Sequence, residues 1–114
     1  MILVHGIKNC DSVKKAARFF KAHGIPFKIC DFRDTPADCA QIDRWLETAG
    51  VDTLLNRRSK AYRAIPQNEK PQTDKEIRNA LCRDNLLIKR PVIEKDDETV
   101  TVGFDKTLYK ELFL

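Results

Sequence analysis

The sequence lacks the residue pairs and runs that mark several common kinds of site. Its four cysteines, at positions 10, 30, 39 and 82, form no Cys-x-x-Cys pair, and it has only two histidines. A zinc site therefore has little support, and no metal is expected. No run of lysine and arginine is interleaved with aromatic residues, so nucleic acid is not an expected partner.

Long apolar segments, repeats and low-complexity tracts are also absent. The N-terminal apolar run, Met1-Ile2-Leu3-Val4, is too short for a signal peptide or a membrane span. We therefore expect a cytoplasmic protein with no membrane partner. In that compartment the cysteines should be reduced at rest, so a disulfide framework is not expected.

What the sequence does have fits one compact domain over residues 1–114. Hydrophobic residues make up 42% of the chain, enough for an ordinary core, and charged residues make up 33%. The formal net charge is +4, which would help to attract an anionic small molecule. We expect a monomer, because a small domain of this type needs no partner to complete its core.

The first third of the chain has the pattern of a βαβ unit. Residues 2–4 are a short apolar, β-branched run that predicts a buried strand, and residues 27–32 predict a second strand. The residues between them have the apolar spacing of a helix. The two strands should run parallel. The apolar stripe of this helix consists of Val13, Ala16, Ala17 and Phe20, and Gly24 ends it.

The middle of the chain predicts helices. Thr35-Pro36 has the form of a helix start, with Pro36 at the first helical position, and Gly50 ends that helix. Residues 51–55 predict a short helical turn. Residues 73–76 have the form of a capping box before a further helix.

The end of the chain predicts a hairpin and a last helix. Residues 91–94 and 99–102 are two strands flanking a polar turn. Asp105 caps the helix, with Leu108 and Leu112 facing inward. A βαβ unit packed with a ββα unit around a mixed sheet is the α/β thioredoxin layout, here with a helical insertion over about residues 35–85.

Cys10 lies between the first predicted strand and the first predicted helix. The unpaired N–H groups and the dipole of a helix N-terminus stabilise a thiolate, which is the nucleophilic form of cysteine. The positive charge of Lys8 would further stabilise the thiolate. The negative charge of Asp11 would destabilise it unless that side chain points away. The competing interpretation is a small buried core residue.

No second cysteine follows Cys10 in sequence, because position 13 is Val13. The thiol that resolves a mixed disulfide must then come from Cys30, Cys39 or Cys82, or from outside. Glutathione is the natural outside thiol in cytoplasm. A structural role is favoured for the other three cysteines, since free cysteine usually behaves as a small hydrophobe.

Two basic segments complete the candidate site: Arg57-Arg58, and Lys89-Arg90-Pro91 before the third strand. In a thioredoxin fold the residue before that strand's proline faces the cysteine, and the proline is typically cis. We therefore expect a cis Arg90-Pro91 bond. An arginine there can bind a carboxylate or oxyanion in fork geometry, whereas the plainer interpretation is a solvated side chain.

Several blocks of the sequence resemble the ArsC-like family, especially its YffB branch. They cover nearly the whole chain in the family's order. The blocks are Gly6-Ile7-Lys8-Asn9-Cys10-Asp11-Ser12, Asp31-Phe32-Arg33, Leu54-Leu55-Asn56-Arg57-Arg58, Ile88-Lys89-Arg90-Pro91 and Val102-Gly103-Phe104.

The resemblance implies a glutathione-dependent thiol–disulfide reductase with no bound cofactor and with glutathione as co-substrate. It implies Cys10 as the catalytic nucleophile. It also implies a substrate- or anion-binding group made of Lys8, Asn9, Arg58, Arg90 and Pro91, in which Arg58 is preferred to Arg57 by its spacing.

The family includes arsenate reductases and Spx regulators, which bind RNA polymerase, so both remain alternatives. Val13 removes the Cys-x-x-Cys switch of Spx proteins. Arsenate reductases carry a further arginine near the last strand, whereas residues 99–104 of this chain contain none.

Overall fold

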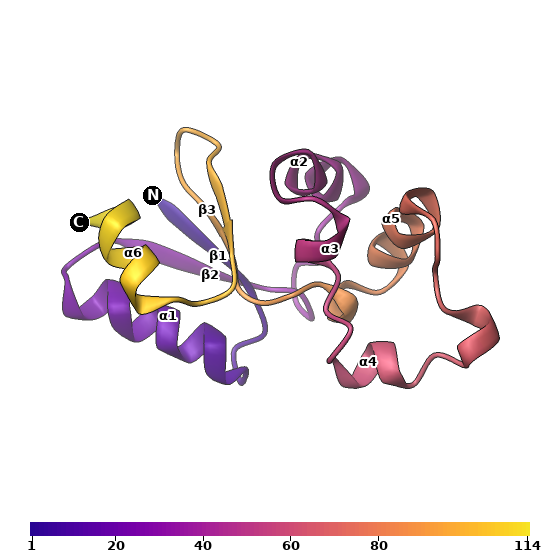
Figure 1. Cartoon of the computed structure of the whole chain (residues 1–114). Helices are drawn as coiled ribbons and strands as arrows, with labels where there is room; N and C mark the ends of the chain where they lie inside the picture. Colours follow the sequence, from indigo (N-terminus) through magenta and orange to yellow (C-terminus); the bar gives the residue numbers. More distant parts are fainter. The chain divides into compact units, whose positions relative to one another are not determined.

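The computed structural model describes all of residues 1–114, which group into two compact units (Figure 1). The first, the sheet unit, joins residues 1–34 to residues 90–114, so the two ends of the chain fold together. The second, the helical unit, consists of residues 35–89. The expected single domain over residues 1–114, with its insertion over about 35–85, stays a prediction.

The sheet unit contains one mixed four-stranded sheet in the order β2-β1-β3-β4. β1 runs parallel to β2, with Gly6 opposite Asp31, and β3 runs antiparallel to both β1 and β4. The predicted βαβ and hairpin pairings are thus confirmed, and with them the α/β thioredoxin-like fold. The strands are β1 (Ile2–Gly6), β2 (Phe27–Asp31), β3 (Val92–Glu94) and β4 (Val100–Val102).

Helices α1 (Asp11–Ala22) and α6 (Lys106–Phe113) pack on the same face of this sheet. Alternate residues of a strand point to opposite faces, so one face of β1 and β3 supplies the apolar layer that these helices cover. The fully buried members of this core are Val4, Val13, Ala16, Phe20, Ile93 and Tyr109.

The prediction for α6 is wrong about which side chains face inward. Leu108 and Leu112 are each 39% exposed, whereas Tyr109 is fully buried. The Phe113 ring meets Tyr109 and Phe20 edge-on, whereas the Tyr109 and Phe20 rings are stacked nearly parallel. The large aromatic rings bury more apolar area than the leucines would, so they set the rotation of the helix.

The helical unit is built from short helices. Its first helix begins at an N-cap residue, Asp38, rather than at the predicted Thr35-Pro36, because the Asp38 and Gln41 side chains form a reciprocal capping box. The predicted capping box at Thr73 is confirmed. The elements are α2 (Cys39–Ala49), α3 (Val51–Leu54), α4 (Lys60–Arg63), η1 (Gln67–Glu69), α5 (Asp74–Arg83) and η2 (Asn85–Leu87).

α2 packs against α3 and α5, and α5 packs against η2. Gly50 turns the chain between α2 and α3 with a φ of 85°, a left-handed conformation that favours glycine. The C-terminal end of the unit pairs with the end of α3, where the Lys89 N–H donates to the Leu54 carbonyl over 2.8 Å. None of the helices has the length and apolar content needed to cross a membrane.

Cys39 and Cys82 form a disulfide in the helical unit, with their Cα atoms 5.4 Å apart. The expectation that no disulfide forms is therefore wrong for this pair, whereas Cys10 and Cys30 are free thiols. The two partners lie 43 residues apart in the sequence. Only the packing of α2 against α5 brings them together, and cysteine spacing carries no sign of that packing.

Candidate active site around Cys10

Cys10 is the N-cap residue of α1, as its sequence position predicts. Its backbone is extended, its N–H donates to the Ile7 carbonyl, and its own carbonyl accepts the Lys14 N–H, both over 3.0 Å. The side chain makes no capping hydrogen bond and is partly buried beside the core of the sheet unit. The sulfur therefore lies at the N-terminal end of a 12-residue helix, where backbone N–H groups and the helix dipole favour negative charge.

The turn that leads into Cys10 is held by Asp31, at the end of β2. Its carboxylate accepts the backbone N–H groups of Lys8 and Arg33, each over 2.9 Å, and also the Arg33 guanidinium. The residue is only 4% exposed. The hydrogen bonds from the Arg33 side chain, followed by that from the Lys8 backbone, lower the pKa of Asp31 to about 2.

Asp31 is thus a positioning residue that sequence reasoning did not single out. It fixes Lys8, two residues before Cys10, to the carboxyl end of β2. The sequence carries one weak signal for this role, an aspartate at the end of a buried strand followed two residues later by an arginine.

The side chains of Lys8 and Asn9 both lie at the surface of this turn. The Lys8 ammonium is 3.5 Å from the Asp34 carboxylate, and both side chains are largely exposed. The Asn9 side-chain oxygen accepts a long, 3.4 Å hydrogen bond from Arg33. Contact of either side chain with a substrate stays a prediction.

The Arg90-Pro91 peptide bond is cis, which confirms that prediction. Gly6, at the end of β1, shows where the aliphatic part of the Arg90 side chain lies. A Cβ added at Gly6 would lie 3.6 Å from the Arg90 Cβ and 2.5 Å from a methyl group of Val13. The Arg90 stem and the first turn of α1 therefore both approach the end of β1, and only a glycine leaves room for them. Contact of the Arg90 guanidinium with Cys10 stays a prediction.

Arg58 belongs to the helical unit and is exposed. Its backbone N–H donates to the Asn56 side chain over 3.0 Å, just before Ser59 caps α4. The neighbouring Arg57 lies 3.4 Å from Asp52, which gives it a local partner. The assignment of Arg58 rather than Arg57 to the active site stays a prediction.

The other free thiol, Cys30, has a different environment. It lies within β2, opposite His5 of β1, and burial raises its pKa. A raised pKa leaves less thiolate at neutral pH, so Cys30 is less suited to nucleophilic attack. No group of three or more His, Cys, Asp or Glu side chains is placed to hold a metal ion. The chemistry open to the Cys10 site is attack by a thiolate on an electrophilic sulfur or a similar centre.

Comparisons with known proteins agree with this architecture. An uncharacterized protein of Haemophilus influenzae is 36% identical over 99% of this chain and 99% of its own length. The solved structure of a YffB protein superposes with a TM-score of 0.92, at 26% identity over the whole of both chains. An arsenate reductase (ArsC) related protein from Brucella melitensis is 32% identical, with a TM-score of 0.76 over 98% of this chain and 93% of that one.

More distant relatives include regulators. The global transcriptional regulator Spx 1 of Oceanobacillus iheyensis is 25% identical over 93% of this chain and 82% of its own length. The model of the ArsC family matches residues 5–112. The chain therefore belongs to the ArsC family and is related within it to the YffB and Spx proteins.

Proposed function

We propose that this protein is a cytoplasmic thiol–disulfide oxidoreductase in which Cys10 is the nucleophile and glutathione supplies the electrons. The observation that carries the proposal is the position of Cys10 as the N-cap of α1, with no capping hydrogen bond of its own. A thiolate there is stabilised by the helix N-terminus yet keeps its lone pairs for attack. Membership of a family that includes arsenate reductase-related proteins supports redox chemistry at this residue.

The reaction is monothiol exchange. The Cys10 thiolate attacks the glutathione sulfur of a mixed disulfide, which forms a Cys10–glutathione disulfide and releases the other half as a thiolate that takes up a proton. A second glutathione thiolate then attacks the glutathione sulfur of this adduct and releases the Cys10 thiolate with oxidised glutathione. The mixed disulfide and one glutathione thus give a free thiol and oxidised glutathione, so the substrate sulfur is reduced and the sulfur of the second glutathione is oxidised.

The basic residues bind the anionic partner in this proposal. Glutathione carries carboxylates, which suit the planar forks of Arg58 and Arg90. Pro91 is fully buried and would act by holding the backbone beside Arg90, and Lys8 and Asn9 would add polar contacts near Cys10. The overall charge of +4 favours the approach of such a ligand.

The test is turnover of a small glutathione mixed disulfide, followed by the consumption of NADPH through added glutathione reductase. Cys10→Ser is expected to lose activity while keeping its circular dichroism spectrum. Cys30→Ser is the matched control and is expected to keep activity. Arg90→Lys should raise KM more than it lowers kcat, because the charge remains but the fork geometry is lost. Activity that survives in Cys10→Ser would refute the proposal.

Two further candidate functions are each favoured by one observation. The arsenate reductase-related protein from Brucella melitensis favours arsenate reduction, although residues 99–104 of this chain offer no arginine for a third contact with the oxyanion. The Spx relative favours a regulator that docks on RNA polymerase. Arsenate reduction by the purified protein would establish the first candidate. Retention of purified RNA polymerase on immobilised protein would establish the second.

A further inference from the structure

The other two cysteines, Cys39 and Cys82, lie at opposite ends of their helices. Cys39 is the first residue of α2, directly after its N-cap Asp38, and Cys82 is in the last turn of α5. Their Cα atoms are 5.4 Å apart, within the range that a disulfide spans. Both are partly exposed, so a small molecule in solution can reach them.

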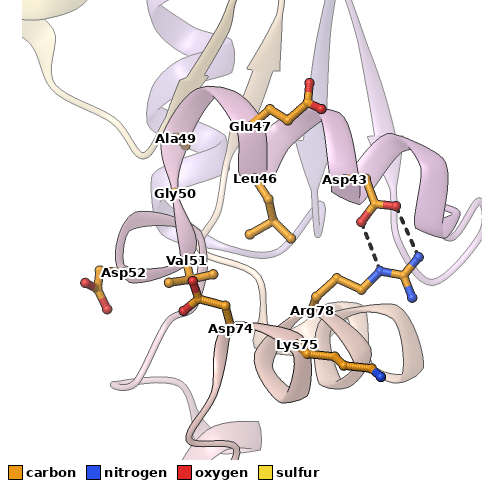
Figure 2. A pocket seen from close by; sticks show the side chains of 10 residues that line it. All are labelled: Asp43, Leu46, Glu47, Ala49, Gly50, Val51, Asp52, Asp74, Lys75 and Arg78. Carbon is orange, nitrogen blue, oxygen red and sulfur yellow. Dashed lines mark hydrogen bonds and ion pairs between the residues drawn. The ribbon is translucent and has the colours of Figure 1, made fainter.

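A second cross-link joins the same two helices one turn further along. The Arg78 guanidinium donates to both carboxylate oxygens of Asp43, over 2.9 and 3.1 Å (Figure 2). Asp43 follows Cys39 by four residues, and Arg78 precedes Cys82 by four. Residues four apart share one face of a helix, so the disulfide and the ion pair are successive cross-links between antiparallel helices.

Beyond the ion pair the two helices border an open hollow of ≈ 900 Å³, with Leu46 of α2 reaching into it (Figure 2). The side chains of Asp43 and Arg78 are 50% and 36% exposed. An exposed ion pair contributes little to stability, since water screens it. The disulfide is therefore the stronger of the two cross-links, and its loss would loosen this end of the helix pair.

The two sulfurs also differ in reactivity. Cys39 faces the N-terminal end of α2, where the helix dipole stabilises a thiolate, whereas Cys82 is at the C-terminal end of α5, where the dipole opposes one. Cys39 is thus the thiol that reacts first with an oxidant, and Cys82 is its resolving partner.

We propose that Cys39 and Cys82 form a second redox site, a dithiol that a low-molecular-mass disulfide oxidises reversibly and that fastens α2 to α5. The Cys39 thiolate attacks the small disulfide, forming a mixed disulfide and releasing one small thiolate. The Cys82 thiolate then attacks the Cys39 sulfur and releases the second. Two protons leave the cysteines, and their two electrons reduce the small disulfide to two thiols. The site is separate from the proposed chemistry of Cys10.

The test equilibrates the Cys10→Ser variant with buffers of stepped ratios of reduced to oxidised glutathione, so its outcome does not depend on Cys10. After an acid quench, the protein is denatured and alkylated, and peptides are assigned by mass spectrometry. We expect Cys39 and Cys82 to pass together from fully alkylated to fully protected as the buffer becomes more oxidising. Cys30 serves as the internal control and should be alkylated at every ratio.

A thermal melt gives the structural readout. A cross-link that closes a loop of 43 residues should raise the melting temperature by on the order of 10 °C in the oxidised protein. That difference should vanish in Cys39→Ser and in Cys82→Ser and persist in Cys30→Ser. The proposal is overturned if the pair stays fully protected or fully alkylated at every ratio. A stable glutathione adduct on one cysteine, or a melting difference that survives in Cys39→Ser, also overturns it.

Discussion

Replacing Asp31 by asparagine tests how the turn before Cys10 is held. The carboxylate has a pKa of about 2 in the folded protein, against an ordinary value of 3.8. That difference corresponds to roughly 2 kcal/mol of stability at neutral pH. The Arg33 side chain that contributes most is 53% exposed, so screening by water reduces the expected loss to about 1–2 kcal/mol. Asparagine keeps one oxygen acceptor for a backbone N–H but lacks the charge.

The pH dependence has a definite sign. Because the folded pKa is depressed, the contribution of Asp31 is present in full above about pH 4. It is lost as the pH falls from 3.8 toward 2. Urea unfolding of both proteins at pH 7 and at stepped acidic values measures the difference in the free energy of unfolding. We expect the gap at pH 7 to close below pH 3.

Asp34 provides a matched control three residues away. Its carboxylate is exposed and touches only the Lys8 ammonium over 3.5 Å, so Asp34→Asn should change stability by less than about 0.5 kcal/mol. The reasoning fails if Asp31→Asn costs no more than Asp34→Asn, or if the gap at pH 7 is unchanged at pH 2.

Three further predictions concern the sheet unit. Tyr109→Phe removes a buried hydrogen bond of 2.7 Å to the Gly103 carbonyl and should cost about 1–3 kcal/mol in urea unfolding; an unchanged midpoint contradicts this. Gly6→Ala places a Cβ within 2.5 Å of the buried Val13 and should lower the free energy of unfolding by about 1–3 kcal/mol. It should also slow alkylation of the Cys10 thiol. Burial lowers the pKa of His5 below 6.5, so its NMR signals should titrate below that value, and its contribution to stability should decline as the pH falls through 6.5; titration above 6.5 contradicts this.

Much of the sheet unit could be predicted from the sequence because its signals are local. The β-branched run at residues 2–4, the helical spacing from Val13 and the stop at Gly24 each depend on neighbouring residues. The same holds for the place of Cys10 at the start of α1, whereas the cis bond before Pro91 was expected from the usual pattern of a thioredoxin fold.

The parts that the sequence did not reveal depend on contacts between distant segments. The Cys39–Cys82 disulfide requires α2 and α5 to pack, and the role of Asp31 requires β2 to end beside the turn at Lys8. The inward face of α6 was mispredicted because Leu108 and Tyr109 are both apolar enough to be buried, and the aromatic partners on α1 decide between them.

Intact-protein and peptide mass spectrometry after brief treatment with oxidised glutathione tests the central claim about Cys10 most directly. The account predicts that the first adduct, of one glutathione, forms on Cys10, that added reduced glutathione removes it, and that Cys10→Ser does not form it. Cys30 should stay unmodified on this timescale, since burial raises its pKa. A first adduct on Cys30, or equal rates at Cys10 and Cys30, would contradict the account.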